Sequence, residues 1–164
     1  MAGPTCGDLL CGEKMNEELQ PLDAATEALI RDSFSRQGLM RHLGAVMHEV
    51  HRGRVSIRLP YSVALTQQHG YFHAGGTSAI ADSAGGYAGY TVFPANSSVL
   101  TVEFKVNLLA PAQGEFLEAV GTVVRSGRTL TVCQLEVFGV TGTNRRQVAL
   151  GQQTLICLQD KPDR

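Results

Sequence analysis

A single aspartate stands within a long apolar and glycine-rich part of the sequence. Between Ser33 and Gln159 the only aspartate is Asp82, and Ala and Gly residues surround it. A carboxylate in this position could act as a general base or as a nucleophile, and both roles stay open. The plainer interpretation is a surface residue, or a structural carboxylate that only makes hydrogen bonds.

His73 precedes Asp82 by nine residues, at the start of a segment, 73–90, whose alanines favour a helix. The first N–H groups of a helix have no partner within it and carry partial positive charge. The backbone of Ala74 and Gly75 could therefore hold a carbonyl oxygen or an oxyanion. For His73 itself, the simpler role is to cap the helix or to bond to a loop carbonyl.

These donors and Asp82 cannot reach one substrate atom from the same helix. At about 1.5 Å of rise per residue they lie roughly 10–13 Å apart along the axis. An antiparallel copy of the helix, supplied by a second subunit, would bring the donors of one chain beside the carboxylate of the other. The chemistry therefore predicts a homo-oligomer with its active site across the subunit interface.

The elements around this helix show strand-like alternation. We expect a first helix between Asp23, its N-cap, and Gly38, a stop signal, followed by a hairpin with strands at about 45–51 and 54–59. Small residues in 73–90 allow close wrapping by a sheet, so an α+β fold is expected. Four further strands are expected at about 100–107 (with Leu100, Val102, Phe104 and Val106 on one face), 115–125, 129–140 and 147–157.

Length and composition limit the classes of protein. The 164 residues suit one domain, expected at 21–160 behind a flexible N-terminal tail at 1–20. A formal net charge of −1 argues against a general nucleic-acid binder or an electrostatic membrane contact. No apolar run reaches the ~18 residues of a membrane helix, and no secretory signal pattern is present, which indicates a soluble, cytoplasmic protein.

Cysteine and histidine form no recognisable metal-binding pattern. The cysteines include no C-x-x-C pair, and Cys133 and Cys157 lie in apolar runs where a thiol acts as a small hydrophobe. His48 and His51 would point to opposite faces of a strand. Phosphate-loop, dinucleotide and G-x-S-x-G motifs are missing too, so no metal or cofactor is expected.

The run QQHGYFHAGGTSAIADSAGGYAGY, with the later LTVEFKVNLLAPAQGEFLEAVGTVVRSGRTLTV, resembles the hotdog-fold acyl-CoA thioesterases of the phenylacetate-degradation (PaaI) type. In that family an amide residue and a glycine precede His-Gly-Gly at the start of the central helix, and an aspartate follows the histidine by nine residues. The resemblance covers about residues 45–157. It implies a hotdog fold, a dimer or tetramer, and hydrolysis of a small or medium acyl-CoA to free acid and CoA.

The resemblance also implies roles for single residues. Asp82 matches the catalytic carboxylate, and the Ala74 and Gly75 amides match the donors that polarise the thioester carbonyl. Ala74 departs from the family's glycine and adds a methyl group where substrate would approach. Three further catalytic positions match the supporting histidine, a water-orienting amide that is Asn in many members, and a hydroxyl near the aspartate: His73, Gln67 and Thr101.

Coenzyme A would be part of the substrate rather than a cofactor. Arg125 and Arg128 flank a turn and are candidates to bind its phosphates, although hairpin solubility explains them equally well. Two other functions are weighed against the thioesterase. One is a regulatory hotdog module that binds acyl-CoA without chemistry, and the other is a hydratase or dehydratase, for which Glu103 is the nearby acid.

Overall fold

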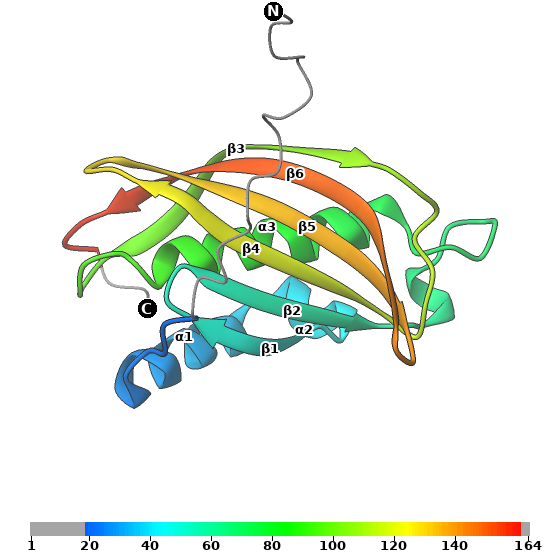
Figure 1. Cartoon of the computed structure of the whole chain (residues 1–164). Helices are drawn as coiled ribbons and strands as arrows, with labels where there is room; N and C mark the ends of the chain where they lie inside the picture. Colours follow the sequence, from blue (N-terminus) through cyan, green and yellow to red (C-terminus); the bar gives the residue numbers. More distant parts are fainter. Residues whose placement is uncertain (1–18, 162–164) are drawn as a thin grey trace, which may run out of the picture.

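The computed structural model describes residues 19–161 and shows a curved antiparallel sheet wrapped round one long helix (Figure 1). The predicted α+β hotdog arrangement is thus confirmed, whereas the predicted tail at 1–20 lies, except for its last two residues, outside the described part. The elements are α1 (Ala24–Arg36), α2 (Gly38–Leu43), β1 (Val46–His51), β2 (Arg54–Pro60), the 3-10 helix η1 (Val63–Leu65), α3 (Ala74–Tyr90), β3 (Ser98–Leu108), β4 (Phe116–Ser126), β5 (Leu130–Thr141) and β6 (Asn144–Leu158).

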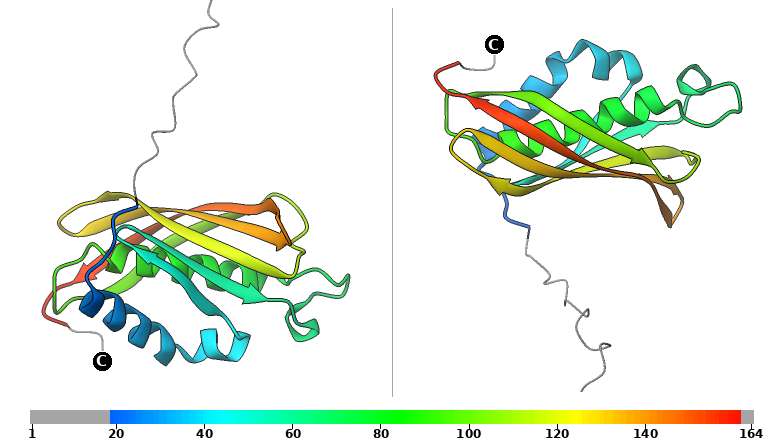
Figure 2. Two further views of the ribbon diagram at one scale, coloured as in Figure 1. Left: turned by 60° about the horizontal axis from the view of Figure 1, so that its bottom comes forward. Right: turned by 90° about the horizontal axis from the view of Figure 1, so that it is seen from above.

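The strand order is β1-β2-β4-β5-β6-β3, so β3 lies at one edge of the sheet beside β6, although it precedes β4 in the chain. All pairings are antiparallel. The sheet curves round α3, and α1 and α2 lie on the same concave side as α3 (Figure 2). No helix in residues 19–161 is long and apolar enough to cross a membrane.

Glycine allows the helix and the sheet to approach each other closely. A Cβ added at Gly85 of α3 would collide with the amide oxygen of Gln153 on β6. On the other side of the contact, a Cβ at Gly121 of β4 would collide with the backbone of Ala84. The close wrapping predicted for 73–90 is therefore observed. It depends on glycines, which have no side chain, on both the helix and the sheet.

The helix α1 begins as the sequence predicts. The side chain of its N-cap, Asp23, accepts a hydrogen bond from the backbone N–H of Thr26 at 2.9 Å, which satisfies one of the unpaired donors of the first turn. Phe34 packs edge-on against Tyr87 of α3, with ring centroids 5.7 Å apart. This contact fixes α1 beside α3.

The predicted stop at Gly38 is wrong, because the chain breaks one residue earlier and Gly38 begins a second helix, α2. The break occurs at Gln37, whose backbone is extended (φ −69°, ψ 107°), a conformation open to any residue. The glycine that ends a helix here is Gly44, which is left-handed with φ 73°.

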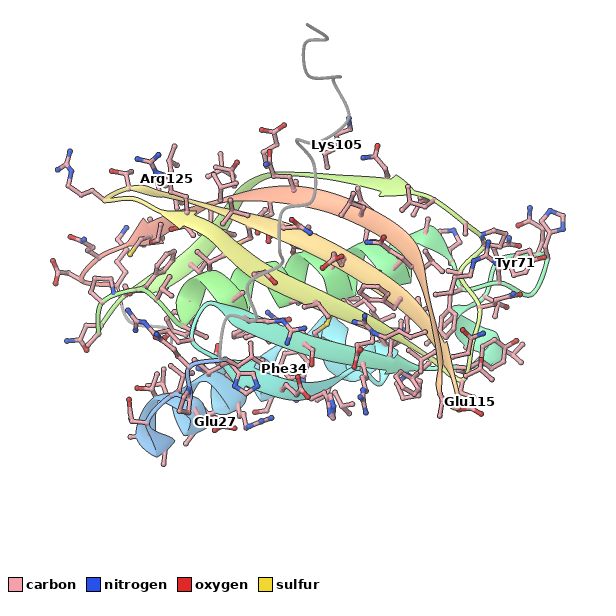
Figure 3. All side chains as sticks on the ribbon, in the orientation of Figure 1. Glu27, Phe34, Tyr71, Lys105, Glu115 and Arg125 are labelled. Atoms are coloured by element: carbon pink, nitrogen blue, oxygen red, sulfur yellow. The ribbon has the colours of Figure 1, made fainter. Side chains whose placement is uncertain are left out.

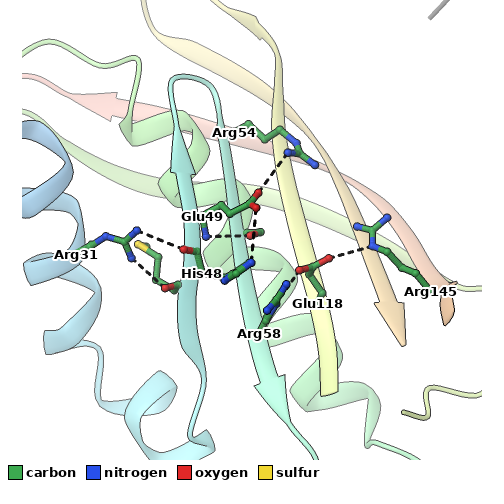
Figure 4. Close-up of polar contacts among 9 residues, drawn as sticks. Arg31, His48, Glu49, Arg54, Arg58, Glu118 and Arg145 are labelled. Carbon is green, nitrogen blue, oxygen red and sulfur yellow. Dashed lines mark hydrogen bonds and ion pairs between the residues drawn. The ribbon is translucent and has the colours of Figure 1, made fainter. Parts of the chain in front are cut away.

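The two edges of the sheet differ in how far they are covered. At the β1 edge, the Arg31 guanidinium of α1 donates to the carbonyl oxygens of Met47 (3.1 Å) and His48 (3.4 Å), as Figure 4 shows. The β3 edge pairs only with β6 and presents apolar side chains, Leu100 and Val102 being 55% and 58% exposed. An open apolar edge strand is a surface on which another strand can pair.

A bulge in β3 changes which residues face α3. Thr101 and Glu103 pair with consecutive residues of β6, so Val102 is an extra residue in β3. One extra residue reverses the faces of everything after it, which is why the predicted uninterrupted alternation through this strand is wrong. Thr101 faces α3 before the bulge, and Val106 packs against the core after it.

The outer face of the sheet carries an ion-pair network centred on Glu118 of β4 (Figure 4). Its two carboxylate oxygens accept from Arg58 at 2.9 Å and from Arg145 at 3.1 Å. Burial acts to raise the pKa of Glu118, but the hydrogen bonds and charges of the two arginines outweigh it and hold this pKa below its ordinary value. Glu118 is therefore a carboxylate with cations on both oxygens.

Cys133 on β5 is the small hydrophobe that the sequence predicts. It is buried, with its Sγ 3.5 Å from the carbonyl oxygen of Gly85. Burial raises the pKa of the Cys133 thiol to about 12, so it carries its proton at neutral pH and is not a nucleophile.

Candidate active site

Asp82 meets two polar side chains from the sheet edge. It lies half-buried in α3, and its Oδ1 accepts a hydrogen bond from the Thr101 hydroxyl of β3 at 2.8 Å. The same oxygen accepts from Nε2 of Gln153 on β6 at 2.6 Å. Gln153 Nε2 also lies 3.0 Å from Thr101 Oγ1, which closes a ring of polar contacts. Side chains from two strands thus hold one oxygen of this carboxylate.

The other carboxylate oxygen is in a different situation. No hydrogen bond from residues 19–161 reaches Oδ2 of Asp82. The directions within the ring are set, because an amide nitrogen can only donate, so the Thr101 hydroxyl accepts from Gln153 and gives its own proton to Asp82. The arrangement leaves one anchored oxygen and one oxygen that can accept a proton from water or attack a carbon atom.

The first turn of α3 forms a second polar group. His73 is the N-cap, and its ring Nδ1 accepts from the backbone N–H of Gly75 at 2.9 Å. Because Nδ1 accepts, the proton of the neutral ring lies on Nε2. The next two N–H groups, of Gly76 and Thr77, donate to the His73 carbonyl oxygen. Within the described residues, the Ala74 N–H is the donor of this turn that makes no hydrogen bond.

The two groups lie far apart within one chain. Ala74 and Asp82 are eight residues apart on α3, which corresponds to about 12 Å along the axis. Among residues 19–161, apart from the neighbouring residues and backbone of its own helix, no atom lies within 4 Å of where a Cβ of Gly86, one turn beyond Asp82, would stand. Within the described residues, this part of α3 is therefore open to close approach by another molecule.

A cavity of about 330 Å³ lies beside the first turn of α3. Gln67 lines it from the loop that precedes α3, and the Gln67 side-chain oxygen accepts from the backbone N–H of His69 within that loop. Gln67 thus lies with Ala74 rather than with Asp82. The remaining lining residues are mainly apolar: Tyr71, Phe72, Thr77, Leu108, Ala110, Pro111 and Ala112.

Arg125 and Arg128 join neither group. Both are exposed, Arg125 near the end of β4 and Arg128 in the turn before β5. Figure 3 places Arg125 at the opposite end of the sheet from Tyr71, which marks the loop before α3. The structure therefore brings Asp82 together with Thr101, and Gln67 with His73, Ala74 and Gly75, but it leaves the two arginines apart.

Gln153 is a site residue that the sequence reasoning missed. It lies in the predicted strand 147–157, where a glutamine ordinarily faces solvent, yet it is only 1% exposed. The alternation of this strand could have revealed it. Residues two apart in a strand face the same side, so Gln153 lies on the same face as Leu155, which is fully buried.

Comparisons with known proteins identify the family of this chain. The family profile described as the Thioesterase superfamily matches residues 69–144, which include His73, Asp82 and Thr101 but not Gln153. A protein of Halobacterium salinarum that bears the provisional name of an esterase is 31% identical over 146 residues, covering 84% of this chain and 95% of the relative.

Solved structures extend the comparison to the fold. A thioesterase family protein from Silicibacter pomeroyi has a TM-score of 0.79 and 44% identity, covering 82% of this chain and 98% of that protein. The Escherichia coli PaaI protein, from the phenylacetic acid degradation operon, has a TM-score of 0.74 at 16% identity, covering 84% and 96%, and shows likeness of fold alone. On the fold, the family profile and these relatives together, the chain belongs to the hotdog-fold thioesterase family and is a hydrolase.

Proposed function

We propose that this protein is an acyl-CoA thioesterase, which hydrolyses a small or medium acyl-CoA to the free acid and CoA. The observation that carries the proposal is the state of Asp82, whose Oδ1 is held by two neutral donors while Oδ2 takes no hydrogen bond from residues 19–161. A carboxylate held in this way has a defined direction and a reactive oxygen.

The reaction needs a donor for the oxygen that becomes negative. In this proposal the Ala74 N–H holds the thioester carbonyl oxygen at the positive end of α3. His73 keeps that turn in place through its bond to the Gly75 N–H and presents Nε2–H outward. Gly75 supports the site in this way, because its own N–H is already used by the His73 ring.

Asp82 supplies the second half of the chemistry, and two routes are compatible with its geometry. As a general base, Oδ2 takes a proton from water, the water oxygen bonds to the thioester carbon, and the carbon–sulfur bond breaks with its electron pair on sulfur. The thiolate then takes the proton back from Asp82. As a nucleophile, Oδ2 itself bonds to the carbon, CoA thiolate leaves, and water cleaves the resulting anhydride.

The separation of the two groups implies that both subunits of a homodimer build each site. The open, apolar edge of β3 supports this proposal, because two copies pairing there antiparallel would form one continuous sheet. The same two-fold axis would place the α3 helices antiparallel, with the Ala74 N–H of one subunit near Asp82 of the other. Tetramers could form from such dimers.

The substrate part of the proposal rests on the surroundings of the first turn. The mainly apolar cavity of about 330 Å³ lies next to Ala74 and has the size and polarity to take a small acyl group. Arg125 and Arg128 are proposed to bind CoA phosphates from the far end of the other subunit. Because CoA thioesters are made inside cells, the proposal also implies a cytoplasmic protein.

The test is release of free thiol from a panel of acyl-CoAs, with the corresponding oxygen esters for comparison. Asp82→Ala and Asp82→Asn are expected to lower kcat by at least ~10², as when a general base or nucleophile is removed. Full activity of Asp82→Ala would refute the proposed role. Binding of acyl-CoA without turnover by the wild type would favour a regulatory module, and a monomer in sedimentation would contradict the shared site.

The structure places Glu103, the acid that the hydratase alternative would use, away from the candidate site. Glu103 follows the bulge in β3 and lines a groove on the outer face of the sheet together with Gln134 and Gln152. It therefore lies on the opposite side of the sheet from Asp82, which favours hydrolysis over the hydratase alternative.

A further inference from the structure

The buried amide of Gln153 is unusual for a side chain between a helix and a sheet. Gln153 is 1% exposed, and its Nε2 reaches the Asp82 carbonyl oxygen at 3.1 Å, Asp82 Oδ1 at 2.6 Å and Thr101 Oγ1 at 3.0 Å. All these acceptors belong to Asp82 or to the hydroxyl that also bonds Asp82. The amide nitrogen therefore serves one residue.

The orientation of this amide is set by charge. An amide oxygen turned toward the Asp82 carboxylate would be repelled, so the nitrogen faces the carboxylate and the oxygen faces the helix at Gly85. Gln153 Oε1 is buried and, among the described residues, has no hydrogen-bond partner. A buried polar atom without a partner is unfavourable for folding. A leucine at this position would avoid that cost, so packing alone does not account for the glutamine.

Gly85 is matched to this arrangement. A Cβ at this position would collide with Gln153 Oε1 and with Leu135 Cδ2, so any side chain at 85 would displace the amide. The helix has no side chain at the point where the amide needs space. Two positions 68 residues apart in the chain are thus adapted to place one nitrogen against Asp82.

We propose that Gln153 is a positioning residue that holds Oδ1 of Asp82 and leaves Oδ2 directed at the substrate. The proposal rests on the proposed function of Asp82. Thr101 shares the task, but it lies on the exposed edge strand, whereas Gln153 acts from inside the protein. Gln153 touches no substrate and acts through Asp82 alone.

The first experiment compares Gln153→Leu with Gln152→Leu, a matched control on the same strand whose side chain is exposed on the outer face. For Gln153→Leu we expect kcat to fall about 10- to 100-fold, the range for losing a hydrogen bond to a charged group. KM stays within about threefold, and the melting temperature does not fall, because an unpaired buried oxygen is removed. Gln152→Leu keeps wild-type kcat.

The second variant, Gln153→Glu, gives a pH signature that a structural role would not produce. At pH values where the pair of carboxyl groups holds one proton, the introduced group can donate it to Asp82, so activity is retained. As pH rises this proton is lost, two carboxylates face each other, and activity falls where wild-type activity stays level. This descending limb is the expected result, and a profile parallel to that of the wild type contradicts it.

The outcomes separate this proposal from the function on which it rests. If wild type cleaves thioesters but Gln153→Leu keeps kcat within twofold, or if Gln153→Leu loses its fold along with its activity, the positioning role is overturned and the thioesterase stands. If wild type cleaves no thioester, the proposed function fails. The carboxyl ¹³C resonance of Asp82 then tests the contact: its chemical shift should change in Gln153→Leu but not in Gln152→Leu, and an unchanged resonance in Gln153→Leu overturns the proposal.

Discussion

Glu118 and Asp82 are two carboxylates held by the same sheet in opposite ways. Glu118 lies on the outer face, and an arginine binds each of its oxygens (Figure 4). Asp82 lies on the side of α3, where an amide and a hydroxyl both bind the same oxygen. The first carboxylate is neutralised by cations on both sides, whereas the second is oriented by neutral groups and keeps one oxygen available.

Under the proposed function, this difference separates a carboxylate that contributes to stability from one that contributes to chemistry. Cations on both oxygens lower the affinity of a carboxylate for protons and block its approach to a substrate, which suits a structural link between strands. Neutral donors on a single oxygen orient the carboxylate and leave its other, reactive oxygen unoccupied. A carboxylate of the first kind should matter for unfolding, and one of the second kind for turnover.

The largest expected effect concerns the second subunit that the proposed site requires, whereas the Glu118 network lies within one chain. Asp82→Ala and Ala74→Pro should each be nearly inactive alone, since Pro removes the N–H of Ala74 at a helix position that tolerates it. His73 before it is extended (φ −67°, ψ 141°), as a residue preceding proline requires. Co-expressed in equal amounts, the two variants should recover about a quarter of wild-type activity, because half the dimers then contain one intact site.

The result of this mixing is decisive for the shared site. If Asp82 and the Ala74 N–H act within the same subunit, no mixed dimer contains an intact site and activity stays at the level of the single variants. The control is the double variant, with both changes in one chain, co-expressed with wild type. Its mixed dimers contain no complete site in the shared arrangement, so activity should drop to about a quarter.

A smaller effect is expected for Glu118→Gln, and it should affect stability alone. Loss of charge weakens the bonds to both arginines, whose side chains are 35% and 40% exposed, so we expect about 0.5–1 kcal/mol lower free energy of unfolding. kcat should be unchanged. Asp82→Asn should do the reverse, with its stability kept and its turnover lost. Urea unfolding and thioester assays on both variants measure this contrast, and a kcat loss in Glu118→Gln would break it.

The smallest effect is on acid stability. Because the pKa of Glu118 in the folded protein lies below its ordinary value of 4.5, its contribution is complete above 4.5 and is lost as pH falls through the folded value. The difference in melting temperature between wild type and Glu118→Gln should therefore shrink below pH 4.5. A difference that stays constant down to pH 3 would show that the arginines do not act through the charge of Glu118.

Local patterns were enough to predict most of the elements. The hairpin before Tyr61, the helix at 73–90 and the later strands all follow from alternation, small residues and turn signals within short windows. The spacing of His73 and Asp82 likewise follows from the chain itself. What failed was local detail, such as Gly38 as a stop and the bulge at Val102, where tertiary packing rather than propensity decides the backbone.

The candidate site could be predicted only in part, for the same reason. Asp82 and the residues that resemble the family motif lie within one continuous segment. The side chains that hold Asp82, Thr101 and Gln153, lie 19 and 71 residues away from it in the sequence. Gln153 is ordinary in a strand until the sheet places it opposite Gly85. Which N–H of the first turn lacks a partner also depends on the rotation of the His73 ring, which the sequence does not specify.

The sequence by itself determined that a small-residue helix would carry one carboxylate and begin at a histidine, because these are properties of residue type and of spacing along one helix. The tertiary structure decided that β3 lies at an open edge beside β6, that the bulge turns Thr101 toward α3, and that a buried amide fills the space left by a glycine. Strand order, register and close contact are set by packing between distant segments, and no local pattern contains that information.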